Sequence, residues 1–241
     1  NERHESSVAH VTGQALFVDD VVLPEGALHI AVGVAENPRA ELTKIDLGNV
    51  ITSHGVVDVI TAWDIPGANQ VGPVVEDEPL LVKSDVQYTG QRIFAVAATS
   101  QELARRAVAK ADIDCSAKPA VLTIHDALKV DSTVTPTRYW GEEDPDALFD
   151  NAATVVDESI YIRGQEHFYL EPQTALALPN EDGIYVLISS QHPGDVQRLV
   201  ANVLGWPMNR VTVECRRMGG AFGGKETQAA PLACLLSLIH I

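Results

Sequence analysis

Apolar residues recur along this chain in different patterns, and each pattern indicates a different kind of element. Alternation of apolar with polar or small residues, typical of a half-buried strand, occurs at residues 28–34 and 211–215. Short apolar runs of strand length occur at residues 56–60, 93–98 and 185–188. Helical spacing occurs at residues 103–111 and 196–204, and the run from Thr227 onward has helical composition. The pattern therefore predicts a fold that mixes strands and helices.

Capping residues indicate where two of these helices begin and end. Residues 99–102, Thr-Ser-Gln-Glu, have the form of a capping box and predict a helix there, with a strand at 113–115 behind it. Asp195 is expected to cap the second helix, and Gly205 with the Trp-Pro that follows it is expected to end it. A strand-helix-strand unit is thus expected in the first half of the chain.

Two other stretches carry weaker signals. Residues 10–20 indicate only a turn and a strand. Residues 133–150 are acidic, contain two prolines and lack a clear period, so we expect a linker there.

The balance of charges narrows the classes of partner. With 17 basic and 33 acidic residues the formal net charge is −16, and such a chain repels a nucleic-acid backbone or an anionic membrane surface. The 3 cysteines form no Cys-x-x-Cys pair, so neither a disulfide framework nor an iron–sulfur or zinc site of its own is indicated. We expect a cytoplasmic protein that binds neither nucleic acid nor membrane. The missing initiator methionine and the apolar end also suggest a segment of a longer protein.

A glycine-rich stretch, residues 216–228, carries the strongest chemical signal. Four glycines flank Phe222 and are followed by Lys225 and Glu226, a pair that looks buried. Glycine is kept where φ must be positive or where another group must approach the backbone closely. The stretch lies between a predicted strand and a predicted helix, a junction whose free N–H groups suit phosphate or another anion.

Two alternatives compete with a cofactor loop at this position. The spacing from Gly219 to Lys225 matches the phosphate loop of ATPases, but Glu226 stands where a Ser or Thr should hold magnesium. A carboxylate beside the phosphates would be repelled, which disfavours a nucleotide site. A plain connecting turn would seldom need so many glycines around a phenylalanine.

Two further segments could support a site. Residues 164–173 are dense in groups that bind metals or move protons, but His167 has no second His or Cys at ligand spacing. We therefore favour a hydrogen-bonding strand that supports the site over a metal centre. Gln191 follows the predicted strand at 185–188, in a loop position where α/β proteins commonly bind ligands.

Residues 217–227 closely resemble the molybdopterin-contacting loop of the xanthine dehydrogenase and aldehyde oxidase family, and residues 164–171 and 10–20 resemble two more of its segments. The resemblance implies an α+β fold in three parts. An α/β hammerhead domain would occupy residues 1–120, a linker 121–145, and an incomplete molybdopterin-binding domain 146–241.

The resemblance also implies roles for single residues. Gln191, Phe222 and Gly223 would bind the molybdopterin cofactor, with Gln191 and Phe222 near the molybdenum through the cofactor's ligands. Glu226 would bind substrate, because its family counterpart faces the purine whereas aldehyde-oxidising relatives carry apolar residues there. The general base is expected beyond Ile241, so no catalytic residue is assigned within this chain.

The implied activity is that of a molybdenum hydroxylase that oxidises hypoxanthine and xanthine to urate in purine catabolism. Electrons would pass to 2Fe-2S clusters and FAD, on a partner subunit or an upstream region, and then to NAD. The complete assembly is expected to be a homodimer. The 241-residue segment alone should be inactive, and the helix starting near Pro231 should lack the partner it packs against.

Three alternatives stay open. Within the family, the substrate could be an aldehyde or another N-heterocycle. Outside it, the chain could be a nucleotide-binding, ATPase-like domain or a non-catalytic interaction domain that has kept the fold.

Overall fold

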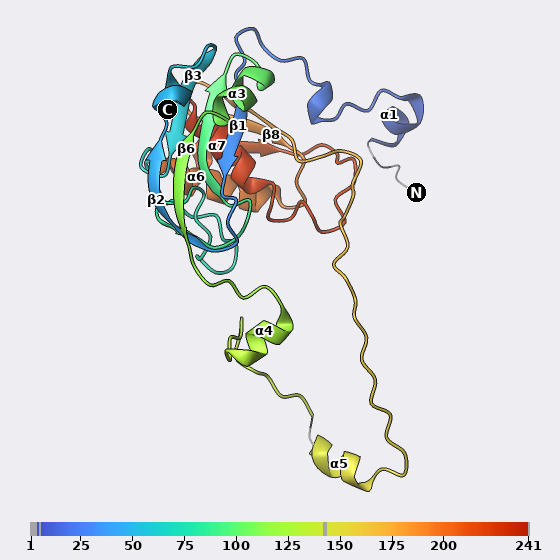
Figure 1. Cartoon of the computed structure of the whole chain (residues 1–241). Coiled ribbons are helices and arrows are strands. Elements are labelled where there is room, and N and C mark those ends of the chain that lie inside the picture. Colours follow the sequence, from blue (N-terminus) through green and yellow to red (C-terminus); the bar gives the residue numbers. More distant parts are fainter. Residues whose placement is uncertain (1–3, 5, 142–143, 241) are drawn as a thin grey trace. The chain divides into compact units, whose positions relative to one another are not determined.

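The computed structural model describes residues 4, 6–141 and 144–240, which form two compact units (Figure 1). The larger unit contains the residues up to Lys118 together with those from His167 onward, and the smaller contains Pro119–Glu166. No helix among the described residues is long and apolar enough to cross a membrane.

The larger unit combines helices with mainly antiparallel strands, which confirms the α+β class. In chain order its elements are α1 (Ser7–Thr12), η1 (Val18–Asp20), β1 (His29–Val34), β2 (Ala40–Asp46), α2 (Gly48–Ile51), β3 (Val56–Thr61), β4 (Asp85–Val86), β5 (Arg92–Ala98), α3 (Gln101–Val108), β6 (Asp112–Ala117), β7 (Ala175–Pro179), β8 (Ile184–Ile188), α6 (Pro193–Leu204), η2 (Met208–Arg210), β9 (Val211–Glu214) and α7 (Ala230–Leu238). The smaller unit contains α4 (Ile124–Lys129) and α5 (Pro145–Asn151).

The first half of the larger unit consists of two antiparallel sheets, with strand orders β1-β5-β3 and β4-β2-β6. The predicted strand-helix-strand unit is present as β5-α3-β6, but its two strands belong to different sheets. Phe94 and Val96 of β5 pack in the core that also contains Leu42 of β2 and, from β6, Ile113. The apolar face of each sheet is therefore buried against the other.

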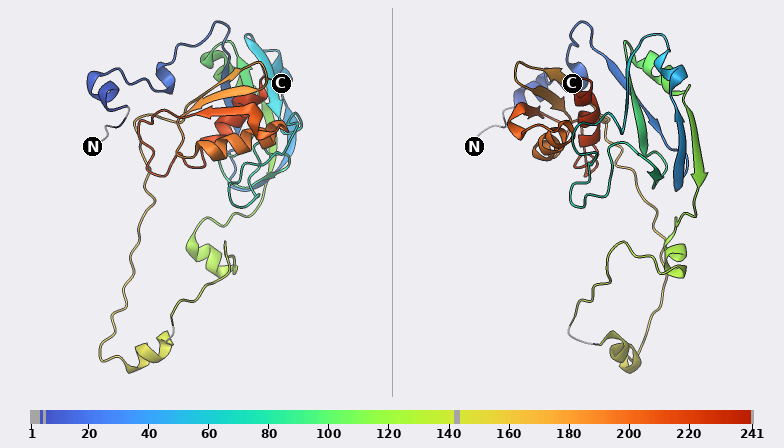
Figure 2. Two further views of the ribbon diagram at one scale, coloured as in Figure 1. Left: turned by 180° about the vertical axis from the view of Figure 1, so that it is seen from behind. Right: turned by 90° about the vertical axis from the view of Figure 1, so that its left-hand side faces the viewer.

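The second half contains a third sheet, of order β7-β8-β9, covered by two helices. Strands β8 and β9 are parallel, so the chain must cross over between them, and α6 makes this crossover. Figure 2 shows α6 and α7 between this sheet and the strands of the first half. Ala95 of β5 belongs to the same core as Leu199 of α6 and Leu235 of α7. Strand β5 is thus buried on both faces and joins the two halves.

The structure corrects the expectation for helix α7. It does not lack a packing partner: Ala233, Cys234, Leu235 and Leu238 are buried in the core that α6 and the third sheet share. A helix that is apolar on all sides is stable when it is enclosed by neighbours on most of them.

Local capping also differs from the sequence prediction at three places. Helix α1 ends at Gly13 (φ 71°) and a 3-10 turn follows, where a turn and a strand were expected. Ser100, one residue after the expected Thr99, caps α3, because its side chain accepts the amide N–H of Leu103. His192 caps α6 through Nδ1, which accepts the N–H of Asp195 at 3.0 Å, so Asp195 lies in the first turn instead.

The described residues of the smaller unit form two short helices and no buried apolar cluster. Neither α4 nor α5 contains a buried residue. Thr123 caps α4, and Asp144 with Pro145 begins α5, within the stretch expected to be a linker. The domain boundaries at residues 120 and 145 remain a prediction.

Candidate cofactor-binding site

The glycine-rich loop between β9 and α7 has an unusual backbone. Phe222 adopts a positive φ of 52°, and its neighbours Gly220 and Gly223 have φ values of 96° and 93°. Such angles are rare for residues with a side chain and persist only where the surroundings impose them. Phe222 is 75% exposed, so burial of its ring does not account for this conformation.

The glycines of the loop serve two different purposes. A Cβ on Gly219 would lie 2.5 Å from the Cβ of Glu171, and one on Gly224 would lie 2.7 Å from Cε1 of Tyr169. These two positions must be glycine for the loop to pack against residues 167–171. A Cβ on Gly223 would meet nothing closer than Nε2 of His167, at 4.0 Å. Gly223 therefore leaves open space beside its backbone.

Behind the loop, Lys225 is completely buried and its ammonium group is fully paired. Nζ lies 3.1 Å from Oε2 of Glu171, 2.8 Å from Oγ of Ser189 and 4.7 Å from the ring centroid of Tyr169. Burial of the amine in this way rules out the role of the lysine in a phosphate loop, which must reach the phosphates of a nucleotide. The structure thus argues against the ATPase alternative.

Glu171 collects three donors on one carboxylate oxygen. Its Oε2 accepts the amide N–H of Gly219 at 2.7 Å and the hydroxyl of Ser189 at 2.6 Å, in addition to Lys225. Burial alone would raise the pKa of Glu171, but these hydrogen bonds and the ammonium charge hold its pKa below the ordinary value. The Lys225–Glu171 pair is therefore charged, with Ser189 between them.

Gln191 is held in one orientation by the same loop. Its side-chain Oε1 accepts the amide N–H groups of Gly223 at 3.1 Å and Lys225 at 3.2 Å. The main-chain N–H of Gln191 donates to the carbonyl of Lys225 at 3.0 Å. Only the oxygen of the amide can accept these bonds, so the positions of O and N in the side chain are determined. Nε2 is left as a donor without an acceptor among the described residues.

Glu226 differs from its neighbour in exposure. The sequence suggested a buried Lys-Glu pair, which is right for Lys225 and wrong for Glu226, whose side chain is exposed. No residue that the structure describes pairs with its carboxylate. Lys225 thus faces the interior, and Glu226, the next residue, faces the solvent.

Of residues 164–173, those from His167 onward support the loop, and none of residues 164–173 lies in a strand. Phe168 has a positive φ of 48°, which interrupts extended backbone. The support comes from Glu171 and from Gln173, whose Nε2 donates to the carbonyl of Gly224 at 2.8 Å and to the hydroxyl of Tyr169 at 3.0 Å. These roles, and that of Ser189, have no signal in the sequence beyond the polarity of the residues.

The donors of the loop fit an anionic or oxygen-bearing cofactor. Three consecutive amide N–H groups, those of Gly220, Ala221 and Phe222, have no acceptor among the described residues, and Nε2 of Gln191 adds a fourth free donor. Such runs of backbone donors bind phosphate and similar groups. Within the described part of the chain no cluster of three His, Cys, Asp or Glu side chains could hold a metal ion. A metal here would depend on the ligands of a cofactor.

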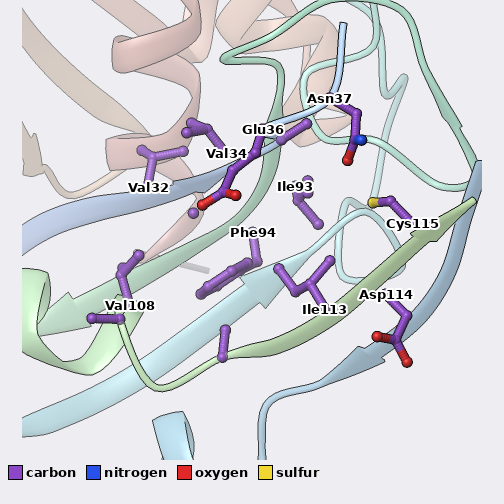
Figure 3. A pocket seen from close by; sticks show the side chains of 14 residues that line it. Val32, Val34, Glu36, Asn37, Ile93, Phe94, Val108, Ile113, Asp114 and Cys115 are labelled. Atoms are coloured by element: carbon purple, nitrogen blue, oxygen red, sulfur yellow. The ribbon is translucent and has the colours of Figure 1, made fainter. Parts of the chain in front are cut away.

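A cavity of about 600 Å³ lies elsewhere, among the strands of the first half (Figure 3). Phe94, Ile113 and Cys115 line it, with the carboxylates of Glu36 and Asp114. Its lining includes none of the four candidate residues. The candidate site is therefore identified by its free hydrogen-bond donors and by the backbone conformation of its loop, and not by this cavity.

The structure places the four candidate residues on one loop and the strand end beside it. Gln191 contacts Gly223 directly, and Phe222 and Glu226 flank the same turn of the loop. All four lie in the larger unit. Their contacts with a cofactor or substrate remain a prediction.

Comparison with known proteins gives two family matches that together span most of the chain. Residues 12–119 match the family model described as "Aldehyde oxidase and xanthine dehydrogenase, a/b hammerhead domain". Residues 125–240 match the model described as "Molybdopterin cofactor-binding domain".

Individual relatives include both kinds of enzyme. The chain is 35% identical over 238 residues to aldehyde oxidase 3 of Rattus norvegicus and 35% identical over 240 residues to xanthine dehydrogenase of Oryza sativa subsp. japonica. Each match covers 98% of this chain but only 18% of the relative.

The fold also has solved counterparts. The aldehyde oxidoreductase of Desulfovibrio gigas superposes with a TM-score of 0.80 at 27% identity, over 97% of this chain and 29% of that one. Quinoline 2-oxidoreductase from Pseudomonas putida 86, at 23% identity and a TM-score of 0.79, shows the same fold. The chain therefore belongs to the aldehyde oxidase and xanthine dehydrogenase family of molybdenum hydroxylases and contains its hammerhead and molybdopterin cofactor-binding domains.

Proposed function

We propose that the protein containing this chain hydroxylates hypoxanthine and xanthine to urate, with molybdopterin bound at the glycine-rich loop. The observation that carries the proposal is the row of free donors, from Gly220 to Phe222 and at Nε2 of Gln191, beside the open space at Gly223. When bound, the cofactor supplies the redox chemistry by which oxygen from water is transferred to an electron-poor carbon.

The residues of the chain would act by binding and orientation. Gln191 would donate Nε2 to an oxygen of the cofactor, because its Oε1 is already occupied by the loop. Gly223 would let the backbone approach the cofactor closely, and Phe222 would lie beside the ligands of the metal. None of these groups moves a proton, and the general base is expected outside residues 1–241.

Glu226 is the feature that favours a purine over an aldehyde. Overall similarity does not distinguish the two, since an aldehyde oxidase and a xanthine dehydrogenase match equally well, at 35% identity. A purine has polar edges with ring N–H groups, and an exposed carboxylate can accept hydrogen bonds from them. Glu226 is exposed and unpaired among the described residues, so it is available for this contact.

We place the electron acceptors outside the described residues. Cys115, Cys215 and Cys234 are free and do not form a cluster site with other ligands in the part of the chain that the structure describes. The 2Fe-2S clusters, FAD and the NAD site would belong to a partner subunit or another region of a longer chain. We place the complete assembly, a homodimer, in the cytoplasm.

Steady-state kinetics on xanthine and on an aromatic aldehyde test the proposal, with Glu226→Val in the full-length protein. An unpaired polar edge in a buried complex costs about 1–3 kcal/mol, so xanthine turnover should fall roughly ten- to a hundredfold. Aldehyde turnover should be spared or improved. Glu181→Val, at an exposed glutamate in the turn between β7 and β8, is the matched control and should change neither.

The outcomes separate the competing functions. Equal losses on both substrates would refute the role of Glu226 in purine selection. A wild-type protein that oxidises aldehydes and not purines would establish the alternative substrate class. If elemental analysis finds no molybdenum in the full-length protein, the hypothesis of a non-catalytic interaction domain is the one that remains.

A further inference from the structure

We infer that Lys225 is a positioning residue: by its buried contacts with Glu171 and Ser189 it fixes the direction in which Glu226 and the cofactor-facing backbone are presented. This inference rests on the proposed function of the loop. Lys225 touches neither cofactor nor substrate in this arrangement, and it would act through its neighbours.

One carboxylate oxygen joins both ends of the loop. Oε2 of Glu171 accepts from the N–H of Gly219, in the first part of the loop, and from Nζ of Lys225, in its last part. Ser189, directly after β8, donates to the same oxygen at 2.6 Å. Residues 219–225 are therefore closed into a ring anchored to the third sheet.

Lys225 also determines where its neighbours face. Its side chain is 0% exposed, and its backbone is held on both sides by Gln191, through the N–H at 3.2 Å and the carbonyl at 3.0 Å. Glu226 is the next residue and is exposed. With the backbone of Lys225 held by Gln191 and its side chain by Glu171 and Ser189, N and Cα of Glu226 are held in place beside the loop, so the starting point of its exposed side chain is set.

The anchor also explains how the loop keeps its unfavourable backbone. Phe222 at φ 52° lies within the ring, and such a conformation requires constraint from its surroundings. The Lys225–Glu171 pair supplies this constraint with two buried charges and the face of Tyr169. If Lys225 is removed, the charge of Glu171 is left buried and uncompensated, and the loop loses its attachment.

The experiment uses three variants of the full-length protein: Lys225→Met, the double variant Lys225→Met with Glu171→Gln, and Lys44→Met. Methionine keeps the length of the lysine side chain and removes its charge. The double variant also removes the buried negative charge, which should restore much of the stability. Lys44 forms an exposed ion pair with Asp112, so Lys44→Met is the matched control and should behave as wild type.

Three measurements are made on each variant: molybdenum per chain, hydrogen exchange of amides 219–226, and kcat/KM per bound molybdenum on xanthine and on an aromatic aldehyde. In both Lys225 variants the loop amides should exchange faster, and xanthine kcat/KM per molybdenum should fall about tenfold or more relative to the aldehyde value. The double variant should regain thermal stability without regaining this ratio.

The double variant decides between positioning and plain stabilisation. If it recovers both stability and the wild-type ratio of xanthine to aldehyde turnover, Lys225 only stabilises the fold and the inference is overturned. Unchanged exchange of the loop amides in Lys225→Met would overturn it too. If the wild-type protein contains molybdenum but does not oxidise purines, the proposed substrate fails, while the exchange rates still decide whether Lys225 orders the loop.

Discussion

Replacement of Gly223 by valine tests the central claim about the loop, that its open side faces a cofactor. In the chain itself the new Cβ would have room, because its nearest neighbour would be Nε2 of His167 at 4.0 Å. The direct effect on the fold comes from the backbone, since Gly223 has a φ of 93°. A side chain at such a position costs roughly 1–2 kcal/mol.

This cost is too small to unfold the protein. Domains are stable by about 5–15 kcal/mol, so the variant should fold and purify. If the open space is where the cofactor lies, the valine side chain would collide with it. An unfavourable contact of about 1.4 kcal/mol already lowers the affinity for the cofactor about tenfold. We expect a larger effect, because the valine side chain would fill the space between the loop backbone and the cofactor. Affinity for the cofactor should therefore fall by more than about tenfold, and the molybdenum content of the purified variant should fall clearly below that of wild type.

Gly90→Val is the matched control for backbone strain. Gly90 has a φ of 90° and no heavy atom within 4 Å of its hypothetical Cβ, and it precedes β5 in the first half of the unit. Both variants should lose similar stability in chemical denaturation, but only Gly223→Val should lose molybdenum by elemental analysis. Full molybdenum content in Gly223→Val, or an equal loss in Gly90→Val, would refute the assignment of the open side.

Three further outcomes follow from the site and from the core that supports it. Gln191→Glu keeps an acceptor for the two loop amides but removes the Nε2 donor. Molybdenum content should therefore stay near wild type while turnover falls about ten- to a hundredfold. Gln191→Leu removes the acceptor too and should lose molybdenum as well. Leu199→Ala, at a fully buried position of α6, should lower the free energy of unfolding by about 2–5 kcal/mol in urea denaturation. The pKa of Glu171 is lowered in the folded chain, so its contribution to the free energy of unfolding is present above the ordinary carboxyl pKa and is lost as pH falls through the lowered value. Glu171→Gln should therefore lose less stability in acid than wild type does, as measured by denaturation across that pH range.

Local pattern was enough to find most of the elements. The runs at residues 93–98 and 185–188 became β5 and β8, and the helical spacing at 196–204 became α6, ended by Gly205 in the left-handed conformation. These elements follow from the period of apolar residues and from the one residue that tolerates positive φ, both of which are properties of neighbours in sequence. The loop at 216–228 was found in the same way, from its glycines.

Capping was less determined by sequence, because several polar residues compete at each helix start. Thr99 and Ser100 are both suitable caps, and the backbone of Ser100, with φ −152° and ψ 157°, is the one placed to accept from Leu103. His192 is an uncommon cap, and its role depends on the turn that follows β8. Only the path of the chain between elements selects among such candidates.

The chemistry of the site was decided by tertiary structure. Lys225 and Glu171 are 54 positions apart, Gly219 and Glu171 are 48 apart, and Lys225 and Ser189 are 36 apart, so no local pattern could pair them. The sequence determined that this chain has a strand, a glycine-rich loop and a helix in succession, with Gln191 after an earlier strand. Parallel pairing of β8 with β9 brings the ends of these two strands together, so that Gln191 lies beside the loop and the buried Lys225 reaches Ser189. The physical reason is that hydrogen bonds and ion pairs act over a few ångströms, and only the packed sheet brings groups so distant in sequence within that range.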